Sequence, residues 1–143
     1  MKFNFKNKIV LITGGEGGLG KSICSKFMEL GAKVIVTTTN KKLINKKTKK
    51  KSYVYLDFNN KNSIQKFSND LKKINKIDIL INNAGINMVS PINEVDEKYL
   101  DEIYKVNLRG PIIMTKQISK IMIKRRKGKI NRACIYAEKY CTY

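Results

Sequence analysis

Histidine is absent from the 143 residues, and the three cysteines (Cys24, Cys134 and Cys141) are irregularly spaced and form no CxxC pair. Without histidine the chain cannot build a Ser-His-Asp triad or a His-based metal site, and the cysteine spacing argues against a disulfide framework. We therefore expect no metal site. No apolar run approaches the roughly 20 residues of a membrane helix, and the N-terminus has no signal-peptide pattern. The expected location is cytoplasmic, without a membrane partner.

Acidic residues are few, because 11 Asp and Glu stand against 30 Lys and Arg, giving a formal net charge of +19. Such an excess invites a nucleic-acid-binding interpretation. However, 26 of the 30 basic residues are lysines, a skew expected from an AT-rich genome, whereas specific binders also rely on arginine. We interpret the charge as solvated surface and expect no specific nucleic-acid partner. A basic polyanion-binding protein, recognisable by steep salt dependence, is the alternative of another class.

Strand-like and helix-like segments alternate along the chain. Continuous apolar runs predict strands at 8–13, 33–38, 53–58, 76–82 and 128–136. Apolar residues at helical spacing predict helices at 19–30, 64–74 and 96–126, the last one bent near Gly110 and Pro111. This alternation predicts an α/β fold, namely a Rossmann-like, doubly wound parallel sheet in the order 3-2-1-4-5, as a single domain over residues 1–143.

A glycine-rich loop follows the first strand, in the stretch Thr13-Gly14-x-x-x-Gly18-x-Gly20. Glycine permits a sharp turn and the close approach of a ligand. The N-terminus of the next helix is a ready site for an anion, such as the pyrophosphate of a dinucleotide. The residues from Gly15 to Ser22 also fit G-x-x-x-x-G-K-S, so a P-loop for a nucleoside triphosphate is the alternative for this segment.

Further motifs stand downstream of this loop. Asp57 comes with the third strand, residues 82–85 read NNAG after the fourth strand, and Asn107 lies in the long helix within VNLRG. Together with TGxxxGxG, these motifs have the order and spacing of the short-chain dehydrogenase/reductase family, which the chain resembles up to about residue 136. The resemblance implies NAD(P)-dependent hydride transfer between an alcohol and a carbonyl of a small-molecule substrate, similar to the 3-oxoacyl-acyl-carrier-protein reductase branch.

The resemblance also assigns roles to single residues. Gly14, Gly18 and Gly20 would bind the cofactor phosphates, and Leu19 between them would lie on the nicotinamide side. The other cofactor contacts that it implies are Asp57 with the adenine ring, Phe58 close by, and Asn83, Ala84 and Gly85 along the adenine ribose. The last three would also support the centre of the sheet.

Asn107 is the one catalytic candidate, since the family's Asn bends its helix and holds a water of the proton relay. Its sequence position is informative without the family. Apolar or small residues lie three, four or seven positions away, at Leu100, Ile103, Gly110 and Met114. This spacing places Asn107 on the apolar face of its helix, so we expect a buried amide that is hydrogen-bonded.

The end of the second strand bears on the choice of cofactor. NAD-preferring enzymes usually place an acidic residue there to bind the ribose 2′-hydroxyl, but this segment reads VIVTTTNKK. Its polar residues can receive a 2′-phosphate instead; they are Thr39, Asn40, Lys41 and Lys42. Against this, Gly17 replaces the family's frequent basic residue, and Glu16 stands beside it. We predict NADP as the cofactor, with NAD as the alternative.

The C-terminal stretch departs from the family pattern. The family has a catalytic Ser after the fifth strand and then a Tyr-x-x-x-Lys pair for proton transfer. Here Cys134 occupies the Ser position, and no Lys stands four residues after Tyr136, Tyr140 or Tyr143. The expectation is a cofactor-binding half, truncated before the catalytic pair, with a sheet incomplete on its C-terminal side. The alternative is a catalytically inactive dinucleotide-binding remnant. A bare fifth strand would favour homo-oligomers or aggregates.

Overall fold

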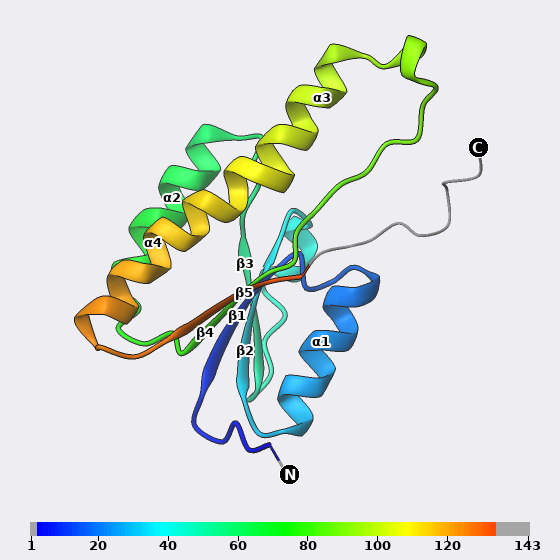
Figure 1. Ribbon diagram of the computed structural model, residues 1–143. Helices are drawn as coiled ribbons and strands as arrows, with labels where there is room; N and C mark the ends of the chain where they lie inside the picture. Colours follow the sequence, from blue (N-terminus) through cyan, green and yellow to red (C-terminus); the bar gives the residue numbers. More distant parts are fainter. Residues whose placement is uncertain (1–2, 134–143) are drawn as a thin grey trace.

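The fold is built on a sheet of five parallel strands, which the computed structural model describes within residues 3–133 (Figure 1). The strands are β1 (Ile9–Thr13), β2 (Lys33–Thr38), β3 (Lys51–Tyr55), β4 (Ile79–Asn82) and β5 (Lys129–Arg132). Their order is β3-β2-β1-β4-β5, and every neighbouring pair is parallel. The predicted fold class and strand order are therefore confirmed.

Helices cover both faces of this sheet. In Figure 1, α1 lies on one face, while α2 and α4 lie side by side on the other. The helical elements are α1 (Gly18–Glu29), η1 (Lys41–Leu43), α2 (Lys61–Leu71), η2 (Ile92–Glu94), α3 (Glu97–Ile103), η3 (Tyr104–Arg109) and α4 (Gly110–Lys124). The elements η1 and η2 are 3-10 turns, and η3 is a π-helical segment that joins α3 to α4.

Two hydrophobic clusters sandwich the sheet and make its inner strands apolar on both faces. On the α1 side, Val10 and Ile12 of β1 belong to one cluster with Cys24. On the other side, Leu11 belongs to a second cluster with Met114 of α4. In the register of β1 with β2, the ends of the two strands are aligned and Thr13 pairs with Thr37.

Two element boundaries differ from the sequence-based prediction in ways that matter for the site. β3 ends at Tyr55, so Asp57 and Phe58 lie in the connection that follows it. The predicted long helix is divided by the π-helical segment η3, which ends directly before Gly110, next to the predicted site of the bend. Gly110 itself has a packing role, because a Cβ at this position would lie 3.0 Å from the ring of Phe58.

The fifth strand is shorter than the predicted 128–136. It ends at Arg132, and its hydrogen-bonded partner is β4. The positions compared with the family's catalytic residues lie outside the described residues; they are Cys134, Tyr136, Tyr140 and Tyr143. Within residues 3–133, β5 is therefore an outer strand of the sheet.

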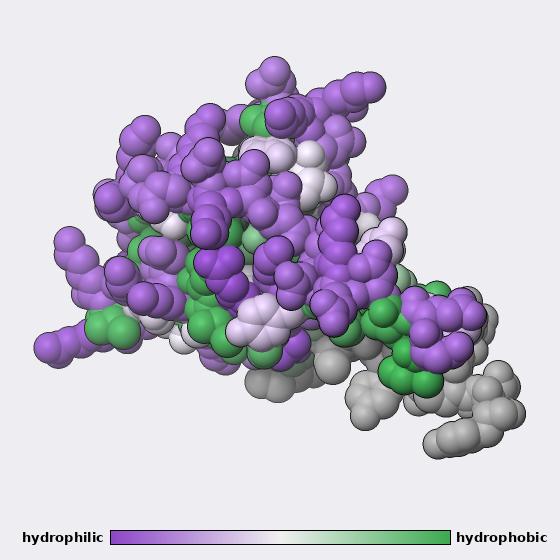
Figure 2. All heavy atoms as spheres, turned by 90° about the horizontal axis from the view of Figure 1, so that it is seen from above, coloured by the Kyte–Doolittle hydropathy of each residue, from purple (hydrophilic) through white to green (hydrophobic). Residues whose placement is uncertain are grey.

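The outer surface is mainly polar. Hydrophilic residues cover most of the face seen in Figure 2, and hydrophobic residues appear there in separate patches. Among the helices that the structure describes, none is both long and apolar enough to cross a membrane.

A buried carboxylate ties the start of the sheet to the end of α4. Asp78 is 6% exposed, and its Oδ2 accepts a hydrogen bond from the Ile9 N–H at 2.9 Å. Its Oδ1 accepts from the Arg125 guanidinium at 3.2 Å, and the Lys76 ammonium lies 3.7 Å from Oδ2. Burial alone would raise the pKa of Asp78, but these donors and the two cations together hold its pKa below the ordinary value.

We expect Asp78→Asn to lower the free energy of unfolding by about 2 kcal/mol at pH 7, because hydrogen bonds to a charged group are lost. Because the pKa of Asp78 is lower in the folded chain than in the unfolded chain, its ionised carboxylate stabilises the fold at pH values above the unfolded-state pKa of about 3.9. This stabilisation is lost as the pH falls through the lower pKa of the folded state. The wild-type chain should therefore lose more stability than the variant between pH 5 and pH 2, as measured by urea unfolding. The control is Asp70→Asn, whose ion pair with Lys73 is exposed and contributes about 0.5 kcal/mol or less.

Candidate functional site

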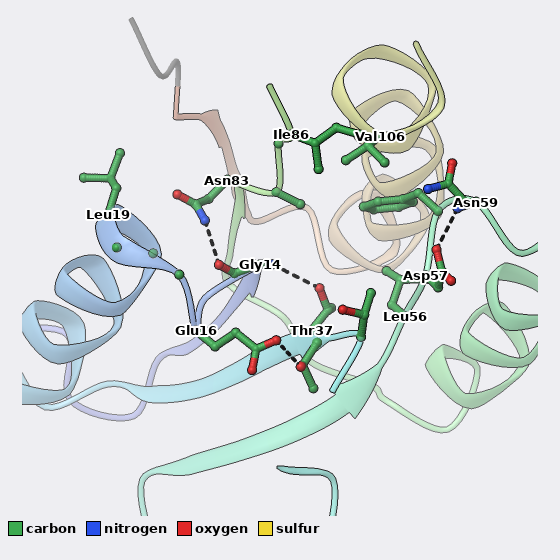
Figure 3. Close-up of a pocket in the computed structure, with 18 residues that line it drawn as sticks. Gly14, Glu16, Leu19, Thr37, Leu56, Asp57, Asn59, Asn83, Ile86 and Val106 are labelled. Atoms are coloured by element: carbon green, nitrogen blue, oxygen red, sulfur yellow. Dashed lines mark hydrogen bonds between the residues drawn. The ribbon is translucent and has the colours of Figure 1, made fainter. Parts of the chain in front are cut away.

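A cleft of about 350 Å³ opens at the carboxyl ends of the strands. The chain runs from β1 to β2 and β3 on one side and to β4 and β5 on the other, so the strand order reverses between β1 and β4. Ligands of open α/β sheets bind in the crevice at such a switch point. The cleft is lined from five segments; its residues are Gly14, 16–20, 37–39, 56–59, 83–86 and Val106 (Figure 3).

Two glycines of the loop after β1 are required by the fold itself. Gly14 has φ +61°, and a Cβ there would lie 3.0 Å from the Cα of Ala84. A Cβ on Gly20 would lie 2.5 Å from the carbonyl oxygen of Gly14 and 2.6 Å from Nδ2 of Asn83. The absence of a side chain at these two glycines therefore lets α1 and the end of β4 pack closely against the turn, and a larger residue at either position would prevent this contact.

Gly18 differs from these two, because a Cβ built on it meets no protein atom within 4 Å. It is the first residue of the 12-residue helix α1, and it lines the cleft. The preceding Gly17 offers no side chain to cap the helix, and the first turn of α1 holds no acidic residue. Free N–H groups and the positive end of the helix dipole thus face open space, which fits an anionic ligand group.

The ends of β1 and β4 are joined beneath the cleft by side-chain hydrogen bonds. Thr13 Oγ1 accepts from the N–H groups of Asn83 at 3.0 Å and Ala84 at 2.9 Å. The Asn83 amide donates in return to the carbonyl oxygens of Thr13 at 2.9 Å and Gly14 at 3.0 Å. Asn83 therefore holds the glycine turn in place. Within residues 3–133, its Oδ1 is buried and has no hydrogen-bond partner.

The ends of β2 and β3 form the other wall of the cleft. Thr37 Oγ1 accepts from the Gly14 N–H at 3.3 Å, and the Thr38 hydroxyl is hydrogen-bonded to the Glu16 carboxylate. Figure 3 shows the Glu16 side chain extending from the glycine loop toward the end of β2. Asp57 Oδ1 accepts from the Asn59 N–H at 2.9 Å, which fixes the turn after β3. This wall therefore carries two carboxylates, those of Glu16 and Asp57, beside the apolar side chains of Leu56 and Phe58.

Only one of the four residues predicted to contact the cofactor at the end of β2 lies in the cleft. Thr39 lines the cleft, whereas Asn40, Lys41 and Lys42 lie outside its lining. The Asn40 side chain caps η1 by accepting from the Lys42 N–H at 3.0 Å. The Lys41 ammonium lies 5.6 Å from the centroid of the Tyr55 ring, a cation–π distance.

Asn107 lies in η3, beside the cleft but outside its lining. Its Oδ1 accepts from the Ile86 N–H at 2.9 Å, and its Nδ2 donates to the Ile86 carbonyl oxygen at 2.8 Å. The predicted hydrogen bonding is confirmed, but the predicted burial is wrong because this side chain is part-exposed. The wider π-helical turn changes the angular position of residue 107, so the α-helical spacing from Leu100 and Met114 does not apply.

The P-loop alternative does not match this geometry. Lys21 and Ser22, the residues that would contact a triphosphate and its metal, are exposed and lie outside the cleft lining. They line a separate depression along α1 with Lys26 and Glu29. The cleft itself contains the glycines of the TGxxxGxG pattern and not the Lys-Ser pair.

Sequence reasoning found most of the lining and missed part of it. The predicted residues that line the cleft are Gly14, Gly18, Leu19, Gly20, Thr39, Asp57, Phe58, Asn83, Ala84 and Gly85. The lining residues without an assigned contact are Glu16, Gly17, Thr37, Thr38, Leu56, Asn59, Ile86 and Val106. Thr37 and Thr38 were recognisable as the last residues of a predicted strand that ends at this edge. Val106 carried no comparable signal, because it reaches the cleft from a π-helical segment.

Comparison with known proteins identifies the family. The family model of the short chain dehydrogenases matches residues 8–137. The chain therefore belongs to the short-chain dehydrogenase family, whose members are oxidoreductases that typically bind NAD or NADP.

Curated relatives match over most of this chain. A 3-oxoacyl-(acyl-carrier-protein) reductase of Buchnera aphidicola is 38% identical over 130 residues, which cover 87% of this chain and 53% of the relative. A galactitol 2-dehydrogenase of Agrobacterium fabrum is 33% identical over 129 residues, or 85% of this chain and 50% of the relative. The chain thus spans about half the length of the curated relatives that it matches.

Solved structures show the same fold. A short chain dehydrogenase of Leptospira borgpetersenii with bound NAD+ has a TM-score of 0.82 and 28% identity, covering 97% of this chain and 56% of that one. A gluconate 5-dehydrogenase of Burkholderia cenocepacia in complex with NADP and tartrate has a TM-score of 0.81 and 24% identity, covering 93% and 55%. These similar folds therefore include one NAD+ complex and one NADP complex.

Proposed function

We propose that the cleft binds a nicotinamide dinucleotide and that this chain supplies the cofactor-binding part of a hydride-transferring oxidoreductase. The observation that carries the proposal is the open space at Gly18, in front of the first turn of α1. The fold does not need a glycine at that position, but a pyrophosphate in contact with the backbone does. When bound, the cofactor would supply or accept the hydride, and the chain's own residues would bind and orient it.

The proposed orientation follows from the walls of the cleft. The adenosine end lies along the ends of β2 and β3, beside Thr39 and the turn that holds Asp57 and Phe58. Gly85 and Ala84 form the opposite wall, along the ribose. The nicotinamide end lies toward Leu19, which is 49% exposed. The phosphates then reach Gly14, Gly18 and Gly20 at the switch point.

The proposed substrate is a small molecule with an alcohol or carbonyl group, as the family implies. We propose that Asn107 acts next to this substrate region by positioning Ile86, since both ends of its amide bind the backbone of that residue. Arg132 of β5 donates to the Asn107 carbonyl oxygen at 2.8 Å and links the same segment to the sheet. The segment after β4 is therefore held at a fixed distance from η3.

The test is a calorimetric titration of the chain with NAD, NADP and ATP–magnesium. We expect saturable binding of a dinucleotide, with ATP bound at least about tenfold more weakly, because the Lys-Ser pair of a P-loop lies outside the cleft. Raising salt from about 50 to 200 mM should change the dinucleotide affinity by less than about threefold, whereas a polyanion binder making several phosphate contacts would lose about 10³-fold or more. Preferential ATP binding or a polyanion-like salt response would contradict the proposal.

We also propose that the chain associates with a second copy of itself. Two surfaces of the structure could mediate this contact. The exposed edge of β5 carries Lys129 and Arg132, and charged residues oppose edge-to-edge pairing. By contrast, α3, η3 and α4 present an apolar stripe with residues four positions apart. Its members are Leu100, Tyr104, Leu108 and Ile112, which are 44–60% exposed. An exposed apolar patch of this kind favours contact with a second copy, so we propose this stripe in place of the β5 edge.

A further inference from the structure

An acidic residue lies at the end of β2 although the strand itself contains none. Glu16 belongs to the glycine loop after β1, and its carboxylate lines the cleft beside Thr38 and Thr39. In the proposed orientation of the dinucleotide, the adenosine ribose lies here. The sequence counts Glu16 against a 2′-phosphate but does not predict it as a ribose ligand, because acids for the ribose are expected about 20 residues after the glycine motif and not within it.

A short hydrogen-bond chain fixes the direction in which Glu16 is held. The backbone N–H of Asn40 donates to Thr38 Oγ1 at 2.9 Å. Because that N–H can only donate, the hydroxyl proton of Thr38 is available for the Glu16 carboxylate, to which Thr38 is hydrogen-bonded. Thr38 is 2% exposed, so this donor is itself held by the sheet. An ionised carboxylate accepts several hydrogen bonds, and Glu16 can therefore accept another from a ligand hydroxyl.

The lysines that would favour a 2′-phosphate, Lys41 and Lys42, belong to the segment after β2 that lies outside the cleft lining. The Lys41 ammonium lies 5.6 Å from the centroid of the Tyr55 ring. Neither lysine lines the cleft, whereas Glu16 does. A 2′-phosphate would add a charge of about −2 at a wall of the cleft that carries the Glu16 carboxylate. The two negative charges would repel each other, and more strongly in a cleft than in bulk water. A 2′-hydroxyl instead gains a charge-assisted hydrogen bond.

We infer that Glu16 selects NAD over NADP by accepting a hydrogen bond from the 2′-hydroxyl of the adenosine ribose. This inference rests on the proposed dinucleotide site. It reverses the preference for NADP that the sequence predicts from the acid-free end of β2. Thr38 is the positioning residue, because its hydroxyl orients the carboxylate.

The experiment compares the dissociation constants of NAD and NADP for four chains: wild type, Glu16→Gln, Thr38→Val and Glu29→Gln. The wild type is expected to bind NAD at least about tenfold more tightly than NADP. In Glu16→Gln this ratio falls at least about tenfold, chiefly through tighter NADP binding, since the amide still accepts from a hydroxyl but carries no charge. Thr38→Val lowers the ratio by a smaller factor. Glu29→Gln makes the same chemical change on the exposed side of α1 and leaves the ratio unchanged.

The possible failures are distinguishable. If wild type and all variants bind neither dinucleotide, the proposed function is wrong, and the role of Glu16 falls with it. If both dinucleotides bind but their ratio is the same in wild type and Glu16→Gln, the site stands and the inference alone is overturned. A wild type that binds NADP more tightly than NAD also overturns it. Thermal unfolding of each variant shows whether an altered ratio comes from a folded chain.

Discussion

Replacing Thr13 by valine is expected to lower the free energy of unfolding by about 3 kcal/mol. The side chain is 2% exposed, and its single oxygen accepts the N–H groups of both Asn83 and Ala84. Valine keeps the shape and the β-branch, so the variant removes an acceptor and leaves two N–H groups beside the core without their partner. Each such group costs about 1–3 kcal/mol. Urea unfolding followed by circular dichroism gives the difference.

Two further substitutions serve as controls for Thr13. Thr13→Ser keeps the oxygen and should retain most of the stability, with a cost of about 1 kcal/mol for the lost methyl group. Thr37→Val removes an oxygen that accepts one longer bond, 3.3 Å from the Gly14 N–H, and should cost less than Thr13→Val. If Thr13→Val is as stable as wild type to within about 0.5 kcal/mol, the hydroxyl is not what joins the ends of β1 and β4.

Replacing Gly18 by aspartate is expected to weaken the binding of both dinucleotides by at least about 100-fold, without loss of stability. A side chain at this position meets no protein atom within 4 Å, so the fold accommodates it. An acidic residue in the first turn of a helix even stabilises it by about 0.3–1 kcal/mol. The same carboxylate would occupy the space of the cofactor phosphates and repel them. Calorimetry and thermal unfolding measure the two effects separately.

The other glycines of the loop provide the contrast for Gly18. Gly20→Ala should destabilise the chain, because its Cβ would lie 2.5 Å from the carbonyl oxygen of Gly14. Gly17→Ala should change the stability of the chain little, because a Cβ at this position would lie 3.9 Å from the Gly14 carbonyl oxygen, an ordinary van der Waals distance. If Gly18→Asp still binds either dinucleotide with an affinity near that of wild type, the phosphates do not lie at the start of α1.

The fold and the position of the site could be predicted because both depend on local and repetitive signals. Buried parallel strands such as Ile9–Thr13 are uninterrupted apolar runs, and glycines must stand wherever the turn after a strand is tight. The carboxyl ends of parallel strands meet at one edge, so the residues after each strand were expected to lie together. Thr39, Asp57 and Ala84 do lie together in one cleft.

The remaining features depend on contacts that no local pattern encodes. Glu16 reaches Thr38 across 22 positions of sequence, and the role that we propose for Glu16 at the ribose rests on that contact. Asn107 was assigned to the apolar face by α-helical spacing, which fails because η3 is π-helical. The sequence sets Glu16 against NADP only through its place in the glycine motif, whereas its position beside the end of β2 follows from the fold.

The most direct test of a dinucleotide site in this cleft is a titration with NAD followed in backbone amide NMR spectra. The account predicts saturable shifts at Gly14 and Gly18–Gly20, at Asp57 and Phe58, and at 83–86, which persist when salt is raised. The lysine-rich stretch 41–51 lies outside the cleft lining, and its amides should move little. Shifts confined to that stretch and lost at higher salt would contradict the account, because they would show a polyanion-binding surface in place of a cofactor site.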